Sequence, residues 1–144
     1  MEMPKLVYHG TFWPDGTELS SEGLRTSYVY VSATPDRRWA RYFAWHKRWE
    51  HREQPGTLAV YEIDTDKLPE EVRERCIPPD GVDPRATGAG GWLQQEEGMK
   101  EERIRVGDFR FPHIPLVAIV GTEEEPKDAQ PDLNVFTVGM LQPV

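Results

Sequence analysis

The sequence predicts an α+β domain: a compact split β-sheet with one main helix after the second strand. Short β-branched and aromatic runs recur along the chain between turn residues, which is typical of strands. One segment with a helix start signal and an apolar stripe follows the second of these runs. The 144 residues can bury a sizeable core, so we expect a single domain over residues 1–144.

The first two strands are expected at residues 6–9 and 28–32. The first run, Leu-Val-Tyr-His, is cut off by the glycine that follows it. The second run, Tyr-Val-Tyr-Val-Ser, is β-branched and aromatic. Because side chains alternate along a strand, Tyr30 and Ser32 should share one face and Val31 should lie on the other.

The main helix is expected from residue 34 to about residue 49. Thr34, Pro35 and Asp36 supply a hydroxyl N-cap, a proline at the first helical position and an acid in the first turn. Within this segment aromatic side chains recur at spacings of three and four, so they form one stripe. Its members are Trp39, Tyr42, Phe43, His46 and Trp49.

The rest of the chain reads mostly as strands. We expect strands at residues 58–63, 103–106, 114–120 and 134–141, and a short helix at 68–75. The run at 114–120 is so apolar that it is expected to be a central strand. Two segments rich in Pro, Gly and acidic residues, 78–91 and 123–131, are expected to be loops.

Composition narrows the function classes. With 17 Lys+Arg against 25 Asp+Glu the net charge is −8, which argues against tight, sequence-independent nucleic-acid binding. No apolar run is long enough to span a membrane, and the start of the chain lacks a signal-peptide h-region, so we expect a cytoplasmic protein or a delivered effector. The single cysteine, Cys76, rules out an intrachain disulfide. Six basic residues nevertheless lie between residues 37 and 52.

Two early segments combine residue types that can carry chemistry. In the first, a strand ends on His9, and Gly10 lets a ligand approach the backbone closely. In the second, Tyr30 and Tyr42 lie on consecutive elements and can hold a flat aromatic ligand between them. The plain structural readings are a strand-end histidine beside a turn glycine and two core aromatics.

A third segment, residues 100–120, carries two glutamates at the entrance of a strand. Glu101 and Glu102 are candidate catalytic carboxylates, although acids at a strand entrance are usually only solvated. A zinc site is not expected, because His46 and His51 are five residues apart on a helix and point in different directions.

In this order the three segments resemble the ADP-ribosyltransferase fold. They are most similar to its His–Tyr–Glu branch, which includes the poly(ADP-ribose) polymerases and diphtheria-type toxins. The resemblance rests on VYHGT with SEGLRT, on VYVSATPDRRWARYFA, and on EERIRV followed by HIPLVAIVG, together roughly half of the chain. The first two blocks also resemble the rifamycin ADP-ribosyltransferases. The resemblance implies an ADP-ribosyltransferase-like domain that transfers ADP-ribose from NAD to an acceptor.

The resemblance implies roles for particular residues. His9 matches the family histidine, which hydrogen-bonds a ribose, and Gly10 matches the residue whose backbone holds the nicotinamide amide. Tyr30 matches the motif tyrosine and, with Tyr42, brackets the nicotinamide. The NAD-binding residues implied in this way are His9, Gly10, Thr11, Arg25, Tyr30, Ser32 and Tyr42.

Glu102 is the best match for the catalytic glutamate, so the implied catalytic set is Glu102, His9 and Tyr30. Glu101 remains an alternative, and Glu97 ranks below both because Gly98 and Met99 follow it rather than a strand. A carboxylate beside the ribose would stabilise the positive charge that develops when the nicotinamide leaves, and this chemistry requires no metal. Lys100 stands where arginine-specific members carry Gln or Glu, so an arginine acceptor is not expected. A protein or small-molecule acceptor is favoured over nucleic acid.

The pyrophosphate of NAD needs cationic partners, and the sequence contains no glycine-rich phosphate cradle. Arg25, Arg37 and Arg41 are candidates, against the alternative that the basic helix face is only solvated. One helical turn before Tyr42, many members of the family carry a small hydroxyl residue, whereas this sequence has Trp39. Two further functions stay open: a non-catalytic module that binds NAD or ADP-ribose, and an RNA 2′-phosphotransferase-like enzyme, which the acidic charge disfavours.

Overall fold

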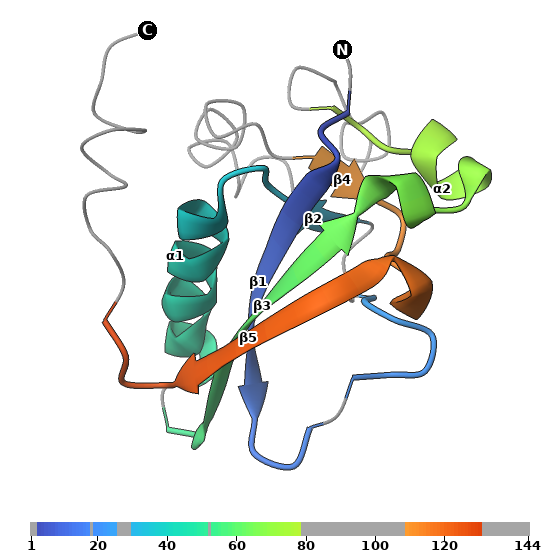
Figure 1. The fold of residues 1–144 in the computed structure, drawn as a ribbon. Coiled ribbons are helices and arrows are strands. Elements are labelled where there is room, and N and C mark those ends of the chain that lie inside the picture. The colour runs from blue at the N-terminus through green and yellow to red at the C-terminus, as the bar shows by residue number, and fades with distance from the viewer. Residues whose placement is uncertain (1–2, 18, 26–29, 52, 79–108, 131–144) are drawn as a thin grey trace, which may run out of the picture.

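The computed structural model describes residues 3–17, 19–25, 30–51, 53–78 and 109–130, although not the side chains of residues 49 and 50. These residues form an α+β arrangement of two antiparallel sheets and few helices (Figure 1). The larger sheet has the order β1 (Leu6–Pro14), β3 (Gly56–Asp64) and β5 (Ile119–Pro126), and the smaller sheet pairs β2 (Val31–Ala33) with β4 (Phe109–Phe111). The helices are α1 (Arg37–Lys47) and α2 (Glu70–Glu74). Short 3-10 turns lie at Arg48–His51, Thr65–Lys67 and Leu116–Ala118.

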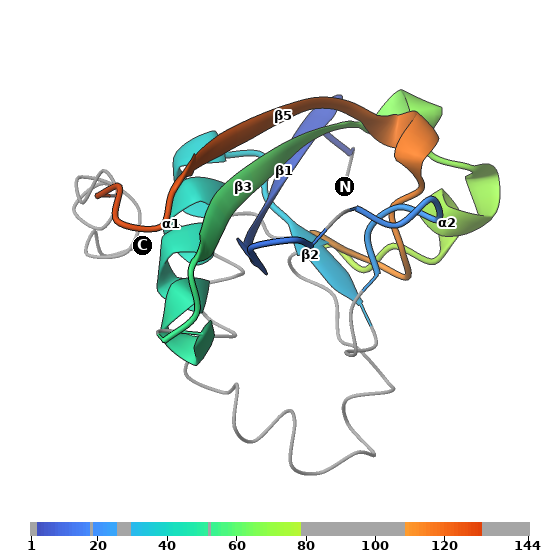
Figure 2. The same cartoon turned by 90° about the horizontal axis from the view of Figure 1, so that it is seen from below.

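The two sheets meet beside β1. Tyr8 and Thr34 exchange two backbone hydrogen bonds, with N···O distances of 2.7 and 2.9 Å. Thr34, the residue after β2, therefore adds one residue pair to the larger sheet. This pair lies along the edge of β1 opposite the edge that pairs with β3. Figure 2 shows β5, β3, β1 and β2 following one another in this order, with α1 alongside.

Strand β1 separates two packed regions because its side chains alternate between its faces. Val7 lies opposite Ile63 and belongs to the main core. Phe12 lies on the other face, where it packs with Leu58 and with Ala44 of α1. One long strand thus contributes both to the core between the sheets and to the contact with the helix.

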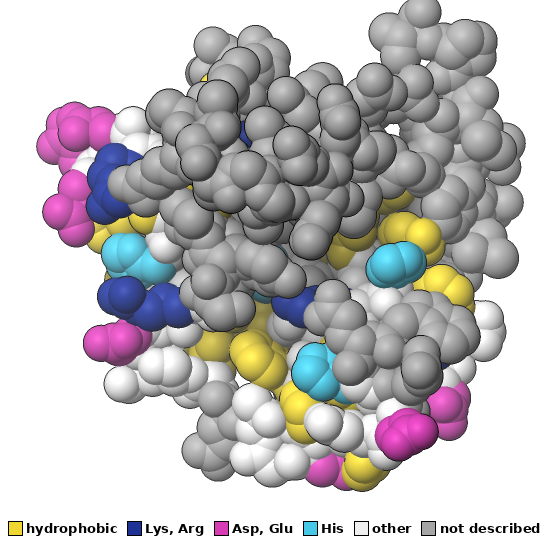
Figure 3. Space-filling view, turned by 180° about the vertical axis from the view of Figure 1, so that it is seen from behind, with side chains coloured by type: hydrophobic (Ala, Val, Ile, Leu, Met, Phe, Trp, Pro, Cys, Tyr) yellow, Lys and Arg dark blue, Asp and Glu magenta, His cyan; other side chains and the backbone are white. Residues whose placement is uncertain are grey.

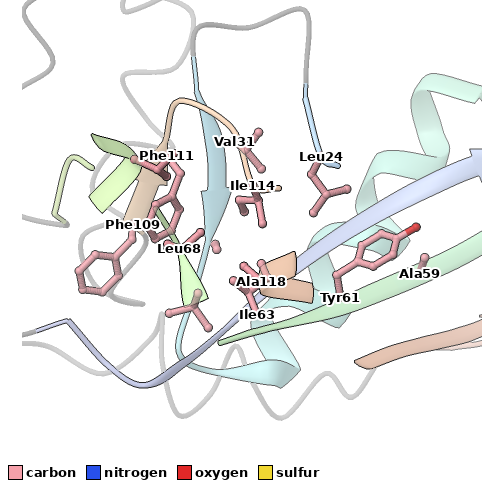
Figure 4. Close-up of a cluster of buried hydrophobic side chains, with 13 residues drawn as sticks. Leu24, Val31, Ala59, Tyr61, Ile63, Leu68, Phe109, Phe111, Ile114 and Ala118 are labelled. Carbon is pink, nitrogen blue, oxygen red and sulfur yellow. The ribbon is translucent and has the colours of Figure 1, made fainter. Parts of the chain in front are cut away.

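The main core lies between the two sheets and holds side chains from distant parts of the sequence (Figure 4). Phe111, Ile63, Ile114, Val7 and Val31 are almost completely buried in the structure. Leu24 and Ile114 also pair through their backbones, which closes the core next to the smaller sheet. Burying such side chains contributes roughly 1.5–3 kcal/mol each to the free energy of folding.

Helix α1 confirms the main helix expected from the sequence, with different ends. Its N-cap is Asp36, whose carboxylate accepts a hydrogen bond from the Arg38 amide at 2.9 Å, so the expected cap at Thr34 is wrong. Thr34 instead pairs with Tyr8 and is held in an extended conformation by that pairing. The expected aromatic stripe is only partly buried: Trp39 is buried, whereas Tyr42 and Phe43 are half-buried and His46 is exposed. The helix meets the sheet through small residues instead, chiefly Ala40 and Ala44.

The expectation of a central strand at residues 114–120 is wrong. Ile114 and Ala118 are buried, but residues 116–118 form a 3-10 turn that exposes Leu116 and Val117. The strand begins only at Ile119 and lies at the end of the order β1-β3-β5. It continues through the acidic residues to Pro126, so the loop expected at 123–131 starts later than predicted.

Other boundaries also shift. Strand β1 does not stop at Gly10 but runs on to Pro14, because it stays paired with β3 over its whole length. Strand β3 and helix α2 confirm the elements expected at 58–63 and 68–75, the latter in shortened form. Strand β4 was not expected. The strands expected at 103–106 and 134–141 lie outside the described residues, as does nearly all of the loop expected at 78–91. Among the described helices, none is long and apolar enough to cross a membrane.

Gly10 allows α1 to lie directly on β1. A Cβ atom at this position would overlap the carbonyl group of Ala40 and crowd the backbone nitrogen of Ala44. We therefore expect Gly10→Ala to lower the free energy of unfolding by about 3 kcal/mol, because backbone atoms of the helix must move to admit the methyl group.

Gly121→Ala in β5 is the matched control, because its Cβ would meet its nearest neighbour, an atom of Glu62, at an ordinary 3.5 Å. Denaturant unfolding of both variants measures the difference. Equal stability of the two variants would show that the helix does not depend on this close approach.

Candidate functional site

His9 lies within β1 and joins it to the segment that forms β2. Its Nδ1 atom is 2.6 Å from the backbone carbonyl oxygen of Ser32, and the residue is only 8% exposed. A carbonyl oxygen can only accept a hydrogen bond, so Nδ1 carries the proton. In the neutral ring Nε2 is then the unprotonated nitrogen, which can accept a hydrogen bond but cannot donate one.

The surroundings of His9 keep its ring neutral. Burial is the largest influence and lowers the pKa of His9 to about 4, although the hydrogen bond to Ser32 acts in the opposite direction. The positive charge of Lys47 lowers the pKa further. At neutral pH the site therefore holds an uncharged imidazole with a defined tautomer.

His9 is part of a small pocket between β1, the β2 segment and α1. Its cavity volume is about 20 Å³, far below the roughly 300–1,000 Å³ of a site that buries a whole drug-sized ligand. This is room for about one water molecule or one small polar group. It is lined by Tyr8, His9, Gly10, Ser32, Ala33, Thr34, Ala40 and Phe43.

Three of the site residues expected from the sequence therefore come together: His9, Gly10 and Ser32. Gly10 has a structural role that the sequence reading did not assign, since a side chain there would collide with Ala40. This contact between the strand and the helix is by itself a sufficient reason for a glycine at position 10. Close approach of a ligand to Gly10 stays a prediction.

The other expected NAD-binding residues do not line this pocket. Thr11 is buried two residues further along β1. Arg25 is exposed and pairs with Glu22 at 3.4 Å. Tyr30, just before β2, is half-buried.

The ring of Tyr42 contacts neighbours on its own helix, including Trp39 and Phe43 at centroid distances of 5.9 and 5.8 Å. The nicotinamide sandwich of Tyr30 and Tyr42 stays a prediction. The catalytic candidates Glu101 and Glu102 lie outside the described residues.

The basic face of α1 is not simply solvated. Arg37 pairs with Glu123 and Arg41 pairs with Glu125, so two carboxylates of β5 hold the helix. Arg41 also donates through Nη2 to the carbonyl oxygen of Ala129 at 3.1 Å. These two arginines are engaged within the fold, which makes them poor candidates for holding a pyrophosphate.

Two groups at this site carry no functional prediction from the sequence. Phe43 was assigned to an aromatic stripe, yet it lines the pocket together with Ala40, one turn earlier on α1. Lys47 was counted only as one of the basic residues, although it follows Phe43 by one further turn and its charge acts on His9. The sequence signal for both was their spacing along the helix, because Phe43 follows Ala40 by three residues and Lys47 follows Phe43 by four.

A metal site is not apparent in the part of the chain described above, where no group of three or more His, Cys, Asp or Glu side chains is placed to hold an ion. Figure 3 shows the face opposite to that of Figure 1, where the acidic side chains that can be seen lie at the margins of the described surface.

Comparisons with protein-family models, with curated proteins and with solved structures found no match for this chain.

The neutral state of His9 predicts a pH dependence of stability. Its folded pKa of about 4 lies below the ordinary value of 6.5, so the unfolded chain binds the proton more tightly. We expect this group to add stability as the pH rises from about 4 to 6.5, by up to about 3 kcal/mol, and to contribute fully above that range.

Unfolding free energies of wild type and His9→Gln across this pH range test the expectation. The variant should lose this part of the pH dependence, whereas His46→Gln, at an exposed position of α1, should retain it. Parallel pH profiles for wild type and His9→Gln would contradict the assignment of a buried neutral ring.

Proposed function

We propose that this protein is an NAD-dependent mono-ADP-ribosyltransferase that transfers ADP-ribose to an acceptor not yet known. The observation that carries the proposal is the pocket around His9. A buried neutral histidine, held by the Ser32 carbonyl and followed by Gly10, lines a pocket between β1, the β2 segment and α1. The motif resemblance assigns the ribose-binding histidine and the nicotinamide-binding glycine to the same two residues.

The protonation state of His9 suits this ligand. The free Nε2 accepts a hydrogen bond, and a ribose hydroxyl group can donate one. The nicotinamide ring of NAD⁺ carries a positive charge, so an imidazolium at this place would repel it. A neutral imidazole with a protonated Nδ1 avoids that repulsion and still offers an acceptor to the sugar.

We place the nicotinamide end of NAD at this pocket and the rest of the molecule outside it. The cavity volume of about 20 Å³ admits a single polar group such as a ribose hydroxyl, so in this proposal the nicotinamide ring lies at the mouth of the pocket. Phe43 adds an aromatic side chain to the lining, against which such a ring can stack. In this proposal the diphosphate and the adenosine extend from the mouth of the pocket over α1.

The reaction breaks the bond between ribose C1′ and the nicotinamide nitrogen. The electron pair of that bond leaves with nicotinamide and neutralises its charge, while the acceptor donates an electron pair to C1′ and releases a proton. Positive charge grows on the ribose as the bond lengthens, so a carboxylate close to it lowers the barrier. We assign this role to Glu102, with Glu101 as the alternative, on the strength of the motif resemblance.

The test is to incubate the full chain with NAD⁺ and measure the release of free nicotinamide. Wild type should release nicotinamide, and Glu102→Gln should lower the rate by about a hundredfold or more, because it removes charge stabilisation from the transition state. Glu70→Gln, which removes an exposed carboxylate from α2, is the matched control and should match wild type.

The outcomes separate the candidate functions. Loss of activity in Glu101→Gln alone would move the catalytic role by one residue. Binding of NAD⁺ without nicotinamide release, unchanged by any of these variants, would indicate a non-catalytic module that binds NAD or ADP-ribose. Absence of both binding and release would reject the proposal.

A further inference from the structure

We propose that Lys47 is the cation that holds the diphosphate of the ligand at the mouth of the His9 pocket. This inference rests on the proposed function and adds a phosphate-binding residue that the sequence motifs do not assign. It takes over the role that Arg25, Arg37 and Arg41 were expected to share.

The position of Lys47 on α1 places it beside the pocket. Ala40 and Phe43 line the pocket from the helix, and Lys47 follows them at spacings of seven and four residues, on the same side of the helix. Side chains of an α-helix lean toward its N-terminus, so that of Lys47 extends back over the turn that holds Phe43. Lys47 is also half-buried, as expected when its aliphatic part packs along the helix surface.

The neighbouring cations already have partners. Arg37 and Arg41 pair with Glu123 and Glu125 of β5, and Arg38 pairs with Asp36 at 3.0 Å. The guanidinium of Arg48 lies over the ring of Trp45, 4.5 Å from its centroid. By contrast, no carboxylate of the described residues lies within 4.0 Å of the Lys47 ammonium.

The charge of Lys47 acts on His9, which lines the pocket. It lowers the pKa of His9, by less than burial does, and its place one turn after Phe43 puts Lys47 beside the same pocket. A dinucleotide whose nicotinamide ribose contacts His9 carries its diphosphate a short distance beyond that sugar. Lys47 is therefore in reach of a dianionic group, and its pairing with that group would also satisfy an ammonium that has no described carboxylate partner.

The experiment compares ligand binding by wild type, Lys47→Ala and Lys47→Arg, with Lys67→Ala as a control that removes an exposed cation next to α2. Calorimetric titrations use NAD⁺ and nicotinamide riboside, which lacks phosphate. Lys47→Ala should weaken NAD⁺ binding by about tenfold or more and leave nicotinamide riboside binding unchanged, because one charge-assisted contact to phosphate is lost. Lys47→Arg should retain most of the affinity, and Lys67→Ala should match wild type.

Three outcomes overturn the inference. If wild type binds NAD⁺ and Lys47→Ala binds it equally well, or loses NAD⁺ and nicotinamide riboside in equal measure, Lys47 does not hold the diphosphate. If wild type does not bind NAD⁺, the proposed function fails, and titration with inorganic diphosphate decides on Lys47 separately. Binding of diphosphate by wild type that Lys47→Ala abolishes would then keep the anion site, and no binding by wild type would reject it.

Discussion

The close approach of helix α1 to strand β1 at Gly10 is the constraint on which the rest of the site depends. Because Gly10 has no side chain, the Ala40 carbonyl lies where a Cβ atom would otherwise be. Ala44 continues the contact one turn later against Phe12, so the helix lies along the strand on small residues. This contact sets where Phe43 and Lys47 stand relative to His9 on the neighbouring strand position. Two ion pairs, Arg37 with Glu123 and Arg41 with Glu125, join the same helix to β5, the strand at the edge of the larger sheet opposite β1.

The second determinant is the junction between the two sheets. Backbone pairing of Tyr8 with Thr34 brings the β2 segment against β1, and the hydrogen bond from His9 Nδ1 to the Ser32 carbonyl lies directly beside it. The junction leaves a buried, uncharged imidazole whose Nε2 is its single acceptor nitrogen. Its pKa is low because burial outweighs the hydrogen bond, so the chemical character of the pocket follows from the packing around it.

The sequence predicted those parts of the fold that depend on local pattern. The apolar run at residues 58–63 and the helix start signal at residues 34–36 reflect interactions between near neighbours, and β3 and α1 form there with shifted ends. The failures arise from contacts between distant residues. The acidic run at 123–125 looks like a loop in isolation, yet it forms a strand because β3 supplies backbone partners and α1 supplies arginines. Similarly, position 10 requires a glycine because it contacts Ala40, thirty residues further along the chain. His9 and Ser32 were placed in one site by a motif, whereas Phe43 and Lys47 required the packing of α1 to be known.

The central claim is that His9 is a neutral, Nδ1-protonated histidine that receives the nicotinamide riboside end of NAD. The most direct test is to record the imidazole ¹⁵N resonances of His9 in the full chain at neutral pH, before and after addition of NAD⁺. The account predicts a protonated Nδ1 and an unprotonated Nε2 in the free protein, and a shift of the Nε2 resonance when NAD⁺ binds. An imidazolium at neutral pH, the opposite tautomer, or an Nε2 resonance that does not move at saturating NAD⁺ would contradict it.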